Sequence, residues 1–167
     1  MTATYRAARA GSTVYVRVVG LAGMRNAPVL DAFLESGRGQ QVATVCIDLS
    51  DCLGMDSTFM GTIVGHAQAL AEAHARLVIV RPGDKNRHLL AMLGVTEVVA
   101  VVDAGEPPAV AFQELDESQS VGTVERMELI QQAHQRLAAL SEANAQKFSP
   151  FLKALEADLG RLRAKAM

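Results

Sequence analysis

The chain has 167 residues, half of them hydrophobic but only 4% aromatic, which corresponds to one domain with an aliphatic core and room for an extension. Its 16 basic and 18 acidic residues give a net charge of −2, and this balance excludes the general positive field of a nucleic-acid-binding protein. No stretch approaches the roughly 20 apolar residues that span a bilayer, and residues 1–9 lack the apolar core of a signal peptide, so we expect a soluble, cytoplasmic protein without a membrane partner.

Strand-like and helix-like patterns alternate along the first hundred residues. β-Branched or apolar runs predict strands at residues 5–10, 14–19, 42–49, 76–80 and 97–102. Helical spacing of apolar residues predicts helices at residues 26–36, 57–74 and 84–93. This alternation is typical of an α/β domain, and each helix has a single apolar side. We therefore expect a mixed sheet of four or five strands with the three helices packed on one face.

The composition changes after this region, which we take as a domain of residues 1–105. Residues 106–120 contain two adjacent prolines followed by acidic and polar residues, and we interpret them as a linker. Residues 121–167 form a predicted helical extension with two amphipathic segments, 122–147 and 150–163.

The extension has apolar stripes that need a partner surface. Its two segments are predicted to be separated at Ser149-Pro150, because proline inside a helix removes a backbone hydrogen bond. The predicted strands 42–49 and 76–80 are apolar on both faces, but the predicted helices would cover only one face of the sheet. We expect the extension either to cover the other face or to pair with a second copy in a homodimer, and we favour the dimer.

Catalytic and metal-binding motifs are not recognisable in the sequence. No glycine-rich phosphate loop follows a strand, and Cys46 and Cys52 do not have the spacing of zinc ligands. His66 and His74 lie on one predicted helix, but no third ligand can be placed beside them. Ser57 has no identifiable His–Asp pair, so a hydrolase triad is not supported. We expect no metal and no cofactor.

One segment, residues 47–61, combines the end of a buried strand, a polar loop and the start of a helix. Asp56, Ser57 and Thr58 stand at the helix start, where such residues are favoured as caps, and capping alone would account for the triplet. A serine at this place also suits regulation, because the free N–H groups and the dipole of a helix N-terminus favour a phosphate.

The same segment resembles the phosphorylation loop of STAS-domain anti-sigma-factor antagonists, in which a strand is followed by Met-Asp-Ser-Ser/Thr-Gly-Leu-Gly and a helix. Five residues match this motif as they stand: Met55, Asp56, Ser57, Thr58 and Gly61. Further similarity follows in the family's order at Ala27-Pro28, residues 76–82 and residues 89–95. The resemblance extends over residues 14–102 and leaves the C-terminal extension without a counterpart.

The resemblance implies a regulatory binding module that is not itself an enzyme. Ser57 would be the phosphoacceptor, exposed at the helix start, with Thr58 as the fallback hydroxyl. The implied partners are an ATP-dependent serine kinase that doubles as an anti-sigma factor and a separate serine phosphatase, and the kinase would supply ATP, magnesium and the catalytic base. The predicted partner-binding surface around Ser57 consists of Gly54, Met55, Asp56, Thr58, Phe59 and Met60.

Two departures from the family pattern affect this surface. Phe59-Met60 replaces the usual Gly-Leu, and because adjacent helical positions point about 100° apart, at least one of the two is expected in an exposed apolar patch. Leu21 and Gly23 stand where the family usually has acidic residues. Two other classes of function stay open: a STAS scaffold in a sensor or transporter complex that is not phosphorylated, and a small-molecule binder or enzyme on the same fold.

Overall fold

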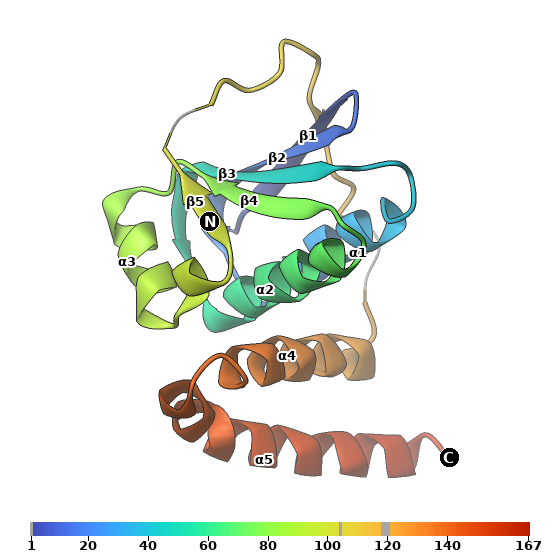
Figure 1. Ribbon diagram of the computed structural model, residues 1–167. Coiled ribbons are helices and arrows are strands. Elements are labelled where there is room, and N and C mark those ends of the chain that lie inside the picture. The colour runs from blue at the N-terminus through green and yellow to red at the C-terminus, as the bar shows by residue number, and fades with distance from the viewer. Residues whose placement is uncertain (1, 104, 118–120) are drawn as a thin grey trace.

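The computed structural model describes residues 2–103, 105–117 and 121–167, and it is a mixed sheet with helices packed beside it (Figure 1). The strands are β1 (Thr4–Ala10), β2 (Thr13–Ala22), β3 (Thr44–Met55), β4 (Arg76–Val80), β5 (Ala100–Val102) and β6 (Gln113–Glu114). The helices are α1 (Ala27–Ser36), α2 (Ser57–Glu72), α3 (Asp84–Met92), α4 (Thr123–Ala138) and α5 (Glu142–Lys165), with a 3-10 turn η1 (Val95–Glu97). The predicted fold class, mixed α/β with a helical extension, is confirmed.

The strands are ordered β5-β4-β3-β2-β1-β6. β1 and β2 form an antiparallel hairpin that turns at Gly11, where φ is +61°, and β2 to β5 are parallel neighbours joined through α1, α2 and α3. β6 pairs antiparallel with β1 inside the predicted linker, so the sheet has six strands and not four or five. Strand β6 consists of two polar residues at the edge of the sheet, and because these show no alternation of apolar and polar residues, the sequence pattern did not predict a strand there. Residues 118–120 of the predicted linker lie outside the described residues.

β3 is longer than the apolar run that predicted it. It pairs with β2 through register shifts as far as Met55, so most of the predicted loop before Ser57 is strand. The end of the sheet therefore leads directly into α2, with Asp56 as the connecting residue.

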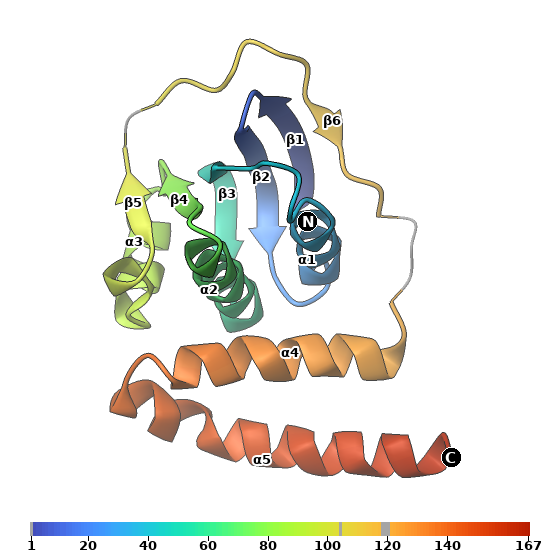
Figure 2. The same cartoon turned by 45° about the vertical axis from the view of Figure 1, so that its right-hand side comes forward.

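Helices α1, α2 and α3 lie along one side of the sheet, as predicted (Figures 1 and 2). Their inward side chains share one core with alternate residues of the central strands. Fully buried members from the three helices and from β2, β3 and β4 are Leu30, Phe59, Leu90, Val16, Ile47 and Ile79. Burial of these aliphatic side chains supplies most of the favourable free energy of folding for a core so poor in aromatics.

The C-terminal extension packs on α2. One of our alternatives, that it covers the opposite face of the sheet, is therefore wrong. α4 lies against α2, and α5 runs back along α4 (Figure 2). We call residues 123–165 the α4–α5 hairpin. The approach to α2 is close: a Cβ on Gly61 would lie 2.2 Å from the carbonyl oxygen of Ala133, and a Cβ on Gly65 would lie 2.7 Å from the Arg136 side chain. Two glycines four residues apart thus make room for α4.

The predicted break at Ser149-Pro150 is wrong. The chain turns before Ser141, whose side chain caps α5 by accepting a hydrogen bond from the Asn144 N–H at 3.0 Å. Pro150 lies inside α5 on its exposed side. It cannot donate the helical hydrogen bond four residues back, and the helix bends in its first half in Figure 2.

Candidate functional site

Asp56 connects β3 to α2 and fixes the geometry of the helix start. One carboxylate oxygen accepts a hydrogen bond from the Phe59 N–H at 2.9 Å, and the other accepts from the Met24 N–H at 2.9 Å. The first bond caps α2, and the second holds the loop between β2 and α1 against the cap. A Cβ on Gly23 would lie 2.6 Å from Oδ2 of Asp56. A side chain at position 23 would therefore compete for space with the Asp56 carboxylate in its present position.

Ser57 is the first residue of α2, and its side chain contacts a residue of the C-terminal extension. Its Oγ lies 2.8 Å from Nε2 of His134 on α4. Nδ1 of His134 lies 2.7 Å from the backbone carbonyl of Ile130, so Nδ1 carries the ring proton and Nε2 accepts the hydrogen bond from the Ser57 hydroxyl. His134 is buried, and its ring packs against the rings of Phe148 and Phe151. The pair does not extend to a hydrolase triad, because a carbonyl takes the place of the orienting carboxylate.

The sequence did not predict the Ser57–His134 contact. The two residues are 77 positions apart, and histidine at this position of an amphipathic helix has no distinctive spacing. We expected Ser57 to be exposed, as a phosphoacceptor must be reached by its kinase, but its side chain is half-buried under α4. The fallback hydroxyl is less accessible still, since Thr58 is buried.

The predicted partner surface is only partly at the surface. Phe59 is 1% exposed and Met60 is 4% exposed, so the prediction that one of them lies in an exposed apolar patch is wrong. Phe59 points into the main core, and Met60 lines a cavity of about 230 Å³ together with Ser57 and Phe148. Of the other predicted members, Gly54 and Thr58 are buried, Met55 is half-buried and Asp56 is exposed. Of the two apolar residues that we expected at a partner surface, Met60 lies beside Phe148 of the hairpin, whereas Phe59 is buried in the core of the domain itself.

Exposed apolar side chains do occur near Ser57, on neighbouring loops and strand ends. Leu21 at the end of β2 lies against Gly54, and Met24 follows it in the loop that Asp56 holds. Leu53 projects from the end of β3, and Met92 from α3 lines the same cavity as Ser57. Between 48% and 58% of each of these four side chains is exposed. Leu21, one of the departures from the family pattern, was the sequence signal that could have revealed this patch. We call these four residues the apolar rim.

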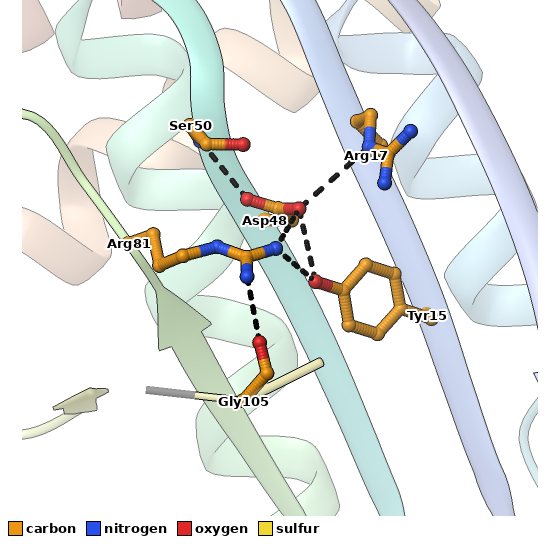
Figure 3. Close-up of polar contacts among 6 residues, drawn as sticks. All are labelled: Tyr15, Arg17, Asp48, Ser50, Arg81 and Gly105. Carbon is orange, nitrogen blue, oxygen red and sulfur yellow. Dashed lines mark hydrogen bonds and ion pairs between the residues drawn. The ribbon is translucent and has the colours of Figure 1, made fainter. Parts of the chain in front are cut away.

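A second group of polar side chains lies on the opposite face of the sheet (Figure 3). Asp48 on β3 is fully buried and accepts hydrogen bonds from the Tyr15 hydroxyl at 2.9 Å and from Arg81 at 2.8 Å, with Arg17 at 3.7 Å. Burial alone would raise the pKa of Asp48, but hydrogen bonds from Ser50, Arg81 and Tyr15 outweigh it and hold that pKa below its ordinary value.

The remaining contacts of this cluster tie the sheet together. Burial, followed by the hydrogen bond to Asp48, raises the pKa of Tyr15 to about 12. Arg81 also donates to the Gly105 carbonyl, and Phe112 packs edge-on against Tyr15 with the guanidinium of Arg17 over its ring. The cluster thus joins β2, β3 and the segment that follows β5. Its charged side chains are mostly buried, with exposed fractions of 0% for Asp48, 27% for Arg17 and 31% for Arg81. We assign it a structural role.

Comparisons with known proteins identify the fold family. A family model described as "Mlab, STAS domain" matches residues 5–103, which is more than half of the chain. A search of curated proteins found no match. Within the described residues, no helix is both long and apolar enough to cross a bilayer.

Solved structures share the fold at low sequence identity. An anti-sigma factor antagonist from Mycobacterium paratuberculosis is 18% identical, with 61% of this chain and 86% of that chain covered and a TM-score of 0.55. SpoIIAA in its unphosphorylated form is 19% identical, with 60% and 89% covered and a TM-score of 0.52. The phosphorylated form of SpoIIAA, a Bacillus cell fate determinant, is 18% identical, with 58% and 89% covered and a TM-score of 0.50. The chain belongs to the STAS-domain family, and its fold is that of anti-sigma factor antagonists.

Proposed function

We propose that this protein is a cytoplasmic regulatory binding module of the anti-sigma-factor-antagonist type and that Ser57 is its phosphoacceptor. The observation that carries this proposal is the position of Ser57 at the first residue of α2, immediately after the Asp56 cap. A phosphate there would meet the N-terminal N–H groups and the positive end of the helix dipole, so it would not unfold α2. Structures of SpoIIAA in both phosphorylation states have the same fold, which is consistent with a switch that keeps the domain folded.

The proposed partners are an ATP-dependent serine kinase that acts as an anti-sigma factor and a serine phosphatase that reverses the modification. The chain supplies a hydroxyl, and the kinase supplies ATP, magnesium and the base. We propose that the partner binds at the apolar rim and at Met55 and Asp56, because Met55, Asp56 and Met92 line the same cavity as Ser57 and the rim side chains are exposed. Charge added at Ser57 would then weaken the contact by repulsion and by its desolvation cost.

The test is phosphorylation of the full chain by an anti-sigma factor kinase of its own bacterium, with the phosphate located by mass spectrometry. Ser57→Ala is expected to abolish incorporation and to keep kinase binding, whereas Ser57→Asp is expected to weaken binding. Equal phosphorylation of wild type and Ser57→Ala would refute the assignment.

A second candidate, a STAS scaffold that is never phosphorylated, is favoured by one observation. The Ser57 hydroxyl is half-buried and hydrogen-bonded to His134, which is unusual for a side chain that a kinase must reach. In that case the apolar rim would bind a sensor or transporter component, and no kinase would modify Ser57. Binding of the partner with equal affinity by wild type and Ser57→Asp would support the scaffold.

We further propose that the outer side of the α4–α5 hairpin forms a homodimer contact. Phe151 is 44% exposed on α5 although it is large and apolar, and Leu162 is half-buried near the end of that helix. A mass of one chain, 17.8 kDa, in light scattering at micromolar concentration would refute the dimer.

A further inference from the structure

The α4–α5 hairpin occupies the side of α2 that contains Ser57. Ser57, Gly61 and Gly65 follow one another at intervals of four residues, so they lie on one face of the helix. All three contact α4: Ser57 through His134, Gly61 through Ala133 and Gly65 through Arg136. A protein that approaches Ser57 along this face must take the place of α4.

The hairpin has a small core of its own. Ile130 of α4 packs with Leu155 and Leu159 of α5, and Val124 and Met127 lie against them, in a cluster separate from the main core. The half of the hairpin on either side of its turn joins the main core, through Leu137 and Phe148 with Leu140 and Leu152 packed against it. Because part of its packing is internal, the hairpin can move away from α2 as a unit and keep α4 and α5 together.

Polar contacts at a few points hold the hairpin on the domain. Nη1 of Arg126 donates to the carbonyls of Met24 and Arg25 at 2.8 and 3.0 Å, beside the Asp56 cap. Nδ2 of Asn144 donates to the carbonyl of Leu93 at 2.8 Å. The third contact is the hydrogen bond from Ser57 to His134, which uses the proton that phosphorylation would remove.

We propose that the α4–α5 hairpin is an intramolecular cover that competes with binding partners for the Ser57 face of α2. Its docking and its release are in equilibrium, and a partner binds the released form. The apparent affinity of that partner is then lowered by the fraction of molecules in which the face is free. The part of the proposal that concerns a kinase rests on the proposed function of Ser57, whereas the cover itself does not.

The experiment measures release of the hairpin without any partner. Ala133→Cys places a thiol on α4 where the side chain is 1% exposed against α2, and its alkylation by iodoacetamide is followed by peptide mass spectrometry. The native Cys52, buried in the domain, serves as an internal reference for global unfolding. Gln132→Cys, on the exposed side of α4, gives the rate for a freely accessible thiol.

Removing a contact between hairpin and domain is expected to accelerate alkylation at position 133. Ser57→Ala and Arg126→Ala, each combined with Ala133→Cys, are expected to raise the rate about tenfold, the effect of losing one hydrogen bond of typical strength. Two matched controls are expected to leave it unchanged: Ser12→Ala, at an exposed serine, and Arg163→Ala, which removes an ion pair to Glu128 within the hairpin.

Three results would overturn the proposal. The thiol of Ala133→Cys could react as fast as that of Gln132→Cys, which would mean that the face is not covered. The rate could stay the same in all variants, which would mean that these contacts do not hold the hairpin. Alkylation of Cys52 could rise in step with that at position 133, which would mean that only global unfolding exposes the face. None of these results depends on phosphorylation, so the proposed function would still be judged by its own experiment.

Discussion

A Cβ atom on residue 23 would lie 2.6 Å from Oδ2 of Asp56, the residue that caps the helix bearing Ser57. Gly23 and Asp56 come from different connections of the sheet, and the Met24 N–H joins them through its hydrogen bond to the same oxygen. A side chain at position 23 would therefore displace the Asp56 carboxylate from the position in which it caps α2.

We predict that Gly23→Ala lowers the free energy of unfolding by about 1 kcal/mol, because the Asp56 carboxylate must move away from its position as cap. Gly23→Asp should cost more, since it adds repulsion between two carboxylates. Urea unfolding measures both effects. Gly160→Ala is the matched control, because nothing lies within 4 Å of a Cβ there and the residue is exposed inside α5, where alanine is favoured. A loss at position 160 equal to that at position 23 would contradict the explanation.

The Asp48 cluster predicts a loss of stability in acid. The pKa of Asp48 is lowered in the folded state, so its contribution is present above the ordinary carboxyl pKa of about 4 and is lost as the pH falls below that value. Asp48→Asn should lower the free energy of unfolding at pH 7 by about 2 kcal/mol and should weaken the acid dependence. Denaturant unfolding at pH 7 and pH 3 tests this, with the exposed Asp51→Asn as control. An unchanged acid dependence in Asp48→Asn would show that other groups cause it.

Phosphoserine incorporated at position 57 should release the hairpin from α2. Phosphorylation removes the proton donated to His134, and the 2.8 Å between Oγ and Nε2 leaves no room for a phosphoryl group. The nearby Asp56 carboxylate would repel the added charge. Alkylation of the Ala133→Cys thiol should therefore accelerate more than it does in Ser57→Ala. Phosphoserine at the exposed position 12 is the control. Slower alkylation would instead mean that the phosphate binds Lys147, which lines the same cavity, and closes the cover.

The apolar rim should contribute to partner binding without contributing to stability. Leu53→Glu places a charge on a side chain that is 58% exposed, and we expect it to weaken binding of the anti-sigma factor at least tenfold while the midpoint of thermal unfolding stays within about 2 °C. Val98→Glu, at a side chain that is 49% exposed beside η1, is the control for surface charge. Calorimetry with the purified partner measures both. Equal affinity in the two variants would remove Leu53 from the interface.

Local sequence was sufficient to predict the central strand β3, the helix cap at Asp56 and the position of Ser57 at the start of a helix. Residues 44–49 are apolar or β-branched except for Asp48, Asp56 has the chemistry of a helix cap, and apolar residues recur at helical spacing after Ser57. These properties depend on neighbours within about four positions, so periodicity and capping preferences could predict them. The same holds for the one-sided packing of α1 to α3, since each helix has one apolar face.

Accessibility at the site was decided by contacts between distant parts of the chain. Ser57 has the sequence context of an exposed serine, but His134, 77 residues later, accepts its hydrogen bond. Phe59 and Met60 point in different directions from α2, which predicted that at least one of them is exposed, yet both are buried in the main core. The amphipathic stripe of the extension predicted that it would pack, but not on which surface. That choice depends on Gly61 and Gly65, because only a helix without side chains at those positions admits α4 at this distance, and the complementarity of two surfaces cannot be read from the sequence of either one.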